Sequence, residues 1–212
     1  MKNEFRVLRI APRIFLYDSN SSAPKLKEGE VAFAQVPSTA FGDGTHPTTR
    51  LCAGAVDQLC RLFRPKSVLD VGTGTGVLAR IARSRGAQFI AGTDIDADAL
   101  IAARANSSLD SSESEILFEN CPPDHWGPRF DLVIANILEE PLLDLAPQLS
   151  RALAPGGRLL VSGFTPLQVP HISVRFKTAG LKSETTSVQD GWAVMIFRSG
   201  ADLANSHRLT DF

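Results

Sequence analysis

The chain has 212 residues, of which 43% are hydrophobic and 21% are charged, a balance typical of one soluble globular domain with a sizeable apolar core. This composition excludes disordered and fibrous proteins. Lysine and arginine number 22 and aspartate and glutamate 23, so the formal net charge is −1. Such a chain has no long-range positive field, so we expect no direct nucleic-acid binding, and any polyanion must be recognised locally.

Three cysteines, Cys52, Cys60 and Cys121, are an odd number without C-x-x-C spacing, which indicates reduced thiols and no metal site. Residues 1–18 mix charged with apolar positions and lack the apolar core and cleavage site of a signal peptide. No apolar run is long enough to span a membrane. We therefore expect a cytoplasmic protein.

The N-terminal part carries strand-like segments. β-Branched and aromatic residues recur over 4–17, a turn cluster of Ser, Asn, Asp and Pro follows at 18–24, and a second strand-like run covers 31–36. These patterns predict a hairpin-like β arm over residues 1–38. After a loop at 39–50, a helix is predicted whose apolar face is formed by Leu51, Ala55, Leu59 and Leu62.

From residue 67 onward, short apolar runs alternate with segments of helical periodicity. The predicted strands cover residues 67–71, 89–94, 115–118, 131–135 and 157–163. The predicted helices cover residues 76–86, 97–108, 141–153 and 166–179. This alternation is the signature of an α/β fold whose parallel sheet is covered by helices on both faces.

The C-terminal part breaks the alternation. Two strand-like runs, 181–188 and 192–198, flank the dipeptide Asp190-Gly191, which favours a hairpin. The sequence therefore predicts a doubly wound, Rossmann-like, mostly parallel sheet of seven strands that ends in an antiparallel hairpin. We expect residues 39–200 to form one ligand-binding domain and residues 201–212 a flexible tail.

The strongest motif is the glycine-rich sequence DVGTGTG at 70–76, between a predicted strand and a predicted helix. Glycines let the backbone turn sharply and approach a ligand, and the following helix start presents unpaired amides. A plain strand-to-helix turn is the alternative. The spacing of Gly72, Gly74 and Gly76 places Val77 where the dinucleotide fingerprint has its third glycine, which disfavours NAD.

Acidic residues near this motif favour a cationic ligand. Asp70 ends the first strand of the sheet, where it would repel a pyrophosphate and attract the amino group of S-adenosylmethionine. Asp94 closes the next strand, where its carboxylate can accept hydrogen bonds from both ribose hydroxyls, and Ile95 can pack against adenine. Asp94 could instead cap the helix at 97–108, although Asp96 is the better cap.

Asn136 directly follows a predicted strand, and ligands of open α/β sheets lie beyond the carboxyl ends of the strands. Its side-chain carbonyl can accept a hydrogen bond from an incoming amine or from the cofactor. The alternative is a buried cap of the helix that starts near Pro141. The loop at 41–49 is either a flap that closes over a ligand or a structured turn capped by Thr48 or Thr49.

Taken together, the motifs resemble the ribosomal protein L11 methyltransferase family over roughly residues 31–198. The segments that carry this resemblance are AFGDGTHPTT, VLDVGTGTGVLA, GTDIDADAL and ANILEEPLLDLAPQLSRALAPGGRLLVSG. The resemblance implies a class I methyltransferase fold, S-adenosylmethionine as the cofactor, and methyl transfer to an amine of a protein substrate, with ribosomal protein L11 as the candidate. This sequence departs from the family pattern at Asp43, where members usually have threonine.

The resemblance also implies site residues. Thr49, Gly72, Asp94 and Asn136 match family positions that contact S-adenosylmethionine, and we expect Phe41 of the same loop to join them. Asn136 is the candidate catalytic residue, because it can hold the neutral amine of an acceptor. No general base is identified.

The family has a separate N-terminal recognition domain, whereas only residues 1–38 precede the loop here. Methylation of another acceptor, protein or small molecule, is therefore one alternative function. A non-catalytic cofactor-binding module is the other.

Overall fold

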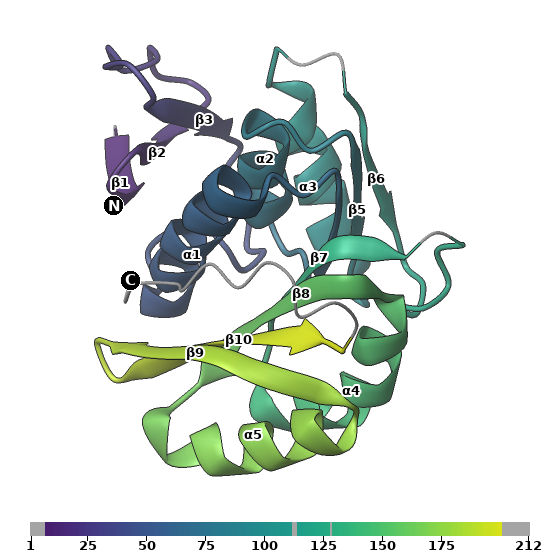
Figure 1. Cartoon of the computed structure of the whole chain (residues 1–212). Coiled ribbons are helices and arrows are strands. Elements are labelled where there is room, and N and C mark those ends of the chain that lie inside the picture. Colours follow the sequence, from purple (N-terminus) through teal and green to yellow (C-terminus); the bar gives the residue numbers. More distant parts are fainter. Residues whose placement is uncertain (1–6, 112–113, 128, 201–212) are drawn as a thin grey trace.

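Two sheets organise the residues that the computed structural model describes, which are 7–111, 114–127 and 129–200. A three-stranded sheet lies at the N-terminal end, and a seven-stranded sheet forms the centre of the fold, with helices on both faces (Figure 1). The start of the expected arm, residues 1–6, and the expected tail, residues 201–212, lie outside the described residues.

The N-terminal sheet consists of β1 (Val7–Ala11), β2 (Ile14–Asp18) and β3 (Val31–Gln35). β1 and β2 form the predicted antiparallel hairpin, and β3 pairs with β2 in parallel. Ile10, Ile14 and Leu16 are buried in the same apolar cluster as the first helix of the central fold. The arm is thus packed into the core through its apolar face.

The central sheet contains β4 (Ser67–Val71), β5 (Phe89–Thr93), β6 (Ile116–Glu119), β7 (Phe130–Asn136), β8 (Leu153–Phe164), β9 (Leu181–Gln189) and β10 (Trp192–Ser199). Their spatial order is β6-β5-β4-β7-β8-β10-β9. Neighbours from β6 to β8 are parallel, and β10 is antiparallel to both β8 and β9. The predicted mostly parallel sheet with a terminal hairpin is confirmed. Asp190 and Gly191 have φ of 50° and 79°, as a tight hairpin turn between twisted strands requires.

The helices are α1 (Pro47–Phe63), α2 (Val77–Ser84), α3 (Ala97–Ser108), α4 (Glu139–Ala152) and α5 (Val169–Thr178), with the short 3-10 helix η1 (Pro166–Gln168) before α5. α1, α2 and α3 cover one face of the central sheet, and α4 and α5 cover the other (Figure 1). Alternate residues of β7 therefore enter different cores: Leu132 and Ile134 pack with the first group, Val133 and Ala135 with the second. None of the helices in the described ranges has the length and apolar character needed to cross a membrane.

Helix α1 begins earlier than predicted, at Pro47, and neither Thr48 nor Thr49 caps it. The cap is His46, whose Nδ1 accepts a hydrogen bond from the backbone N–H of Thr48 at 3.3 Å. Proline at the first helical position is compatible with this start, because its ring fixes a helical φ and its missing N–H is not needed there. The loop before α1 is thus shorter than the sequence indicated.

The starts of α3 and α4 show whether Asp94 or Asn136 caps a helix. Asp96 caps α3, as expected, by accepting from the backbone N–H of Asp98 at 2.9 Å. Helix α4 begins at Glu139, two residues before the predicted start, and its cap position is Leu138. Asn136 therefore does not cap this helix and remains the last residue of β7.

Candidate functional site

A cavity of about 680 Å³ opens at the carboxyl ends of β4, β5 and β7. This is the point where the strand order reverses, since β4 lies between β5 and β7, and open α/β sheets bind ligands there. The lining includes the expected residues Phe41, Gly72, Gly74, Asp94, Ile95 and Asn136. The sequence motifs from four separate segments therefore meet at one cavity.

The glycine loop that joins β4 to α2 has room for no side chain at two positions. Gly72 and Gly74 have φ of 69° and 54°, in the left-handed region. A Cβ at Gly72 would meet Cγ2 of Ile137 at 2.3 Å, and a Cβ at Gly74 would meet the carbonyl oxygen of Phe41 at 2.1 Å. Both glycines thus permit close packing at the cavity wall. Gly76 packs against Ala103 instead and does not line the cavity.

The loop between β3 and α1 is bound directly to the glycine loop. The backbone N–H of Thr75 donates to the carbonyl oxygen of Phe41 at 2.8 Å, and the Thr75 hydroxyl donates to the carbonyl oxygen of Gly42 at 2.8 Å. Gln35, the last residue of β3, donates from Nε2 to the same Gly42 oxygen and to Oγ1 of Thr75, both at 3.3 Å. The loop at 41–49 is therefore anchored at Phe41 and Gly42.

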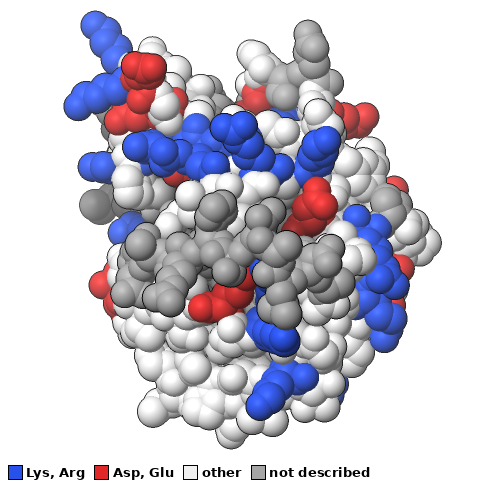
Figure 2. Space-filling model, viewed as in Figure 1, with Lys and Arg blue, Asp and Glu red and all other residues white. Residues whose placement is uncertain are grey.

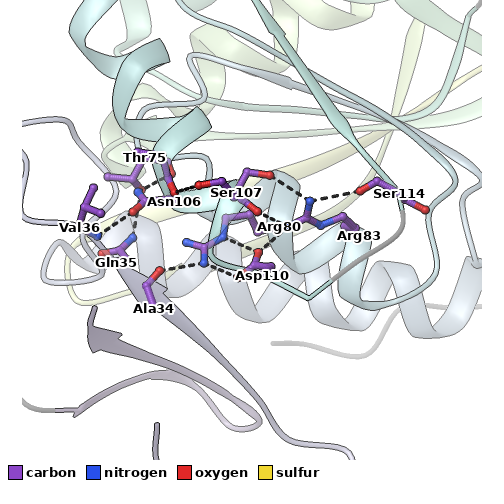
Figure 3. A network of polar contacts seen from close by, with 12 residues as sticks. Ala34, Gln35, Val36, Thr75, Arg80, Arg83, Asn106, Ser107, Asp110 and Ser114 are labelled. Carbon is purple, nitrogen blue, oxygen red and sulfur yellow. Dashed lines mark hydrogen bonds and ion pairs between the residues drawn. The ribbon is translucent and has the colours of Figure 1, made fainter. Parts of the chain in front are cut away.

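A polar network that joins β3 and the residues after it to α2 and α3 extends this anchor (Figure 3). Asn106 of α3 accepts from the backbone N–H of Val36 at 2.8 Å and donates to the carbonyl oxygen of Thr75 at 3.0 Å. Arg80 of α2 is fully buried, pairs with Asp110 at 2.6 Å and donates to a backbone carbonyl of β3 at 2.8 Å. These bonds connect the N-terminal sheet to α2, which follows the glycine loop, and to α3.

Asp70 lies beneath the glycine loop and does not line the cavity. Its side chain is 1% exposed and accepts hydrogen bonds from the Thr73 hydroxyl at 2.8 Å and the backbone N–H of Ala79 at 3.2 Å. Burial raises the pKa of Asp70 to about 7, although these hydrogen bonds oppose the shift. The geometry gives Asp70 a bracing role at the start of α2.

Asp94 has the exposure and bonding of a ligand-binding carboxylate. One oxygen accepts from the backbone N–H of Gly74 at 2.9 Å and the other from that of Asp96 at 3.0 Å, which fixes the side chain at the cavity wall. Each carboxylate oxygen has a further lone pair for a hydroxyl donor. Ile95 beside it is 91% exposed, an apolar face available to a ring.

Asn136 lines the cavity and carries an unsatisfied acceptor. Its Oδ1 is buried and has no hydrogen-bond partner among the described residues. Because an unpaired buried polar atom is costly, it indicates a missing donor from a ligand. The hydroxyl of Thr49 is also buried and unpaired, but Thr49 itself does not line the cavity.

The cavity is also lined by Trp192, Gly163 and His46, none of which is a site residue predicted from the sequence. The His46 ring lies 5.2 Å from that of Phe41 and 4.8 Å from that of Trp192. Gly163 could have been found, because it ends a predicted parallel strand. Trp192 carried no such signal: it starts β10, and only the antiparallel pairing of β10 brings its first residue to the edge where the parallel strands end.

Comparisons with known proteins agree with these motifs. The sequence profile of the ribosomal protein L11 methyltransferase family (PrmA) matches residues 1–200. The chain belongs to this family. A member from Geobacter sulfurreducens, a ribosomal protein L11 methyltransferase, is 42% identical over 163 residues, which are 77% of this chain and 53% of that protein. The chain spans just over half the length of this relative.

Solved structures agree on the fold. The crystal structure of a ribosomal protein L11 methylase from Lactobacillus delbrueckii subsp. bulgaricus has a TM-score of 0.82 and 28% identity, and the match covers 92% of this chain and 100% of that one. The N-methyltransferase NodS from Bradyrhizobium japonicum, solved with S-adenosyl-L-homocysteine, has a TM-score of 0.57 and 14% identity over 74% of this chain and 90% of that one. This second similarity shows that the same fold also occurs in a protein of low sequence identity.

Gly74→Ala tests the contact between the two loops. Alanine must adopt a positive φ and displace the backbone of Phe41, so the free energy of unfolding should fall by about 1–3 kcal/mol more than in Gly86→Ala. Gly86 is the matched control, because its φ is 97° and nothing lies within 4 Å of a Cβ there. Equal losses in urea denaturation would show that Phe41 does not restrict this position.

Asp70→Asn tests the buried carboxyl. With a pKa of about 7 in the folded state and 3.8 as its ordinary value, Asp70 binds more protons folded than unfolded between these values. Its contribution to stability therefore falls as pH rises toward 7, whereas asparagine keeps the acceptor and cannot ionise. The unfolding free energy of the variant minus that of the parent should increase from about pH 5 to about pH 8. A difference independent of pH would contradict the raised pKa.

Proposed function

We propose that this chain is an S-adenosylmethionine-dependent methyltransferase that methylates an amine of a protein substrate, and that this substrate is ribosomal protein L11. The observation that carries the proposal is the unpaired Oδ1 of Asn136, which lines the same cavity as the glycine loop and Asp94. The names of the relatives support the choice of substrate.

The cavity fits the cofactor in size and chemistry. Its volume of about 680 Å³ is in the usual range for small-molecule sites, roughly 300–1,000 Å³. Asp94 would accept hydrogen bonds from the ribose hydroxyls, Ile95 would pack against the adenine, and Gly72 and Gly74 would allow the ligand to approach the backbone. The bound cofactor supplies a methyl group activated by a positively charged sulfur.

The chain's own residues would prepare the acceptor. Oδ1 of Asn136 accepts a hydrogen bond from an N–H of the incoming amine and so fixes the direction of its lone pair. Alignment of this kind is a large part of the rate enhancement in a two-reactant step. The protein's contribution is to position the acceptor amine, and Asn136 is its principal contact with that amine.

The acceptor must also be uncharged. A lysine in water has a pKa of about 10.4, so its amine is mostly protonated at neutral pH. Ile137, Leu138 and Trp192 give the cavity an apolar wall near Asn136. An apolar wall disfavours the ammonium form, so desolvation on entry would promote loss of the proton to water.

Asp94→Ala tests the cofactor site. Loss of the carboxylate should weaken S-adenosylmethionine binding by about 1–3 kcal/mol, because charge-assisted hydrogen bonds to the ribose are removed. Asp98→Ala is the matched control, since Asp98 is exposed on the first turn of α3 and does not line the cavity. Calorimetric titration of both variants gives the comparison, and equal affinities would remove Asp94 from the site.

Methyl transfer itself is tested with tritiated S-adenosylmethionine and purified ribosomal protein L11. We expect label in L11, and Asn136→Ala should lower the turnover number by about 100-fold through loss of alignment. Asn20→Ala is the control, because Asn20 is exposed in the turn after β2. Label in a different protein of a cell extract would contradict the substrate, and no transfer to any protein would contradict the activity.

A further inference from the structure

A second cavity, of about 1,490 Å³, lies between the β1–β2 hairpin, α1 and the end of α2. Among the described residues, none lines both this cavity and the one at the ends of β4, β5 and β7, which we call the cofactor cavity. Among its lining residues are six arginines: Arg9, Arg13, Arg50, Arg61, Arg64 and Arg85. We call this cavity the arginine cleft.

The arginine cleft concentrates positive charge that the composition hides. Asp57, the one carboxylate among the described residues of its lining, already pairs with Arg85 at 2.6 Å. Arg13, Arg61 and Arg64 make no side-chain hydrogen bond or ion pair within the part of the chain that the structure describes. Figure 2 shows Lys and Arg side chains gathered in a band across the upper half of the face viewed there. Three guanidinium groups of the cleft therefore have no anionic partner among the described residues.

The arginines of the cleft indicate a phosphate-containing ligand. A guanidinium group is planar, stays charged, and binds phosphate oxygens through two parallel hydrogen bonds. The cleft is larger than a usual small-molecule site, which is roughly 300–1,000 Å³, so an extended polyanion fits it better than one nucleotide. The chemistry is that of a phosphodiester backbone.

The residues of the lining favour a double-stranded over a single-stranded nucleic acid. Single-stranded nucleic acids bind through aromatic side chains on which bases stack, and no Phe, Tyr or Trp is among the described residues of the lining. Double-helical RNA is recognised through its phosphates and 2′-hydroxyls instead. A ribosomal protein substrate is an RNA-binding protein, so RNA is the polyanion expected near it; this step rests on the proposed function.

We propose that the arginine cleft binds the phosphate backbone of double-helical RNA. The proposal departs from the sequence expectation that the chain binds no nucleic acid, because a net charge of −1 does not reveal where the charges lie. Arg50 also donates from Nε to the carbonyl oxygen of Gly44 at 2.8 Å. Since Gly44 belongs to the loop that lines the cofactor cavity, RNA in the cleft would lie beside that loop.

Fluorescence anisotropy with a labelled RNA hairpin tests the proposal. The double variant Arg61→Glu/Arg64→Glu should bind about tenfold more weakly than the parent at about 100 mM salt, with a shallower dependence of affinity on salt. Lys177→Glu/Lys182→Glu makes the same change in net charge at exposed positions outside the cleft, and its affinity should stay within about twofold of the parent.

Arg61 lies in the last turn of α1, so thermal melting accompanies each variant. Arg61→Gln/Arg64→Gln removes the charges without reversing them, and should also weaken RNA binding. Absence of binding by the parent, or equal weakening by the arginine and lysine variants, would overturn the proposal. Equal affinity for duplex DNA, or tighter binding of polyglutamate, would overturn the assignment to RNA. None of these measurements depends on methyl transfer.

Discussion

The candidate cofactor site depends on one close contact between two loops. The carbonyl oxygen of Phe41 lies where a side chain at position 74 would have to be, and it accepts the backbone N–H of Thr75. From the other side, Asp94 accepts the N–H of Gly74. The glycine loop is thus held between the acidic end of β5 and the loop that precedes α1. Because Gln35 also reaches this point, the N-terminal sheet is bonded to the site.

The two carboxylates at the ends of neighbouring strands have separate roles because their surroundings differ. Asp70 is buried, its hydrogen-bond donors come from the glycine loop and α2, and its pKa is raised. Asp94 keeps access to the cavity and is fixed by two backbone N–H groups. Asp70 therefore braces the glycine loop from its buried side, whereas Asp94 lies at the cavity wall. Asp70 and Asp94 thus occupy similar positions at the ends of strands but differ in their interactions, since burial decides which carboxylate can accept a hydrogen bond from a ligand hydroxyl.

Local patterns predicted most of the fold, because each strand or helix carried its own period and its own turn residues. Asp190-Gly191 predicted the terminal hairpin, and the helix at Ala97–Ser108 was placed with its cap. The parallel pairing of β3 with β2, the burial of Asp70 and the place of Trp192 could not be predicted, since each depends on residues distant in sequence. The arginine cleft was hidden for the same reason: its arginines come from three segments whose charges are offset elsewhere in the chain.

Everything proposed for this chain requires that the cavity at the ends of β4, β5 and β7 bind S-adenosylmethionine. Isothermal titration of the purified chain with S-adenosylmethionine, S-adenosylhomocysteine and NAD measures this binding. We predict one binding site per chain for each of the first two ligands and no binding of NAD. Binding of NAD in preference to the other two, or no heat of binding from any of the three, would contradict this account of the site.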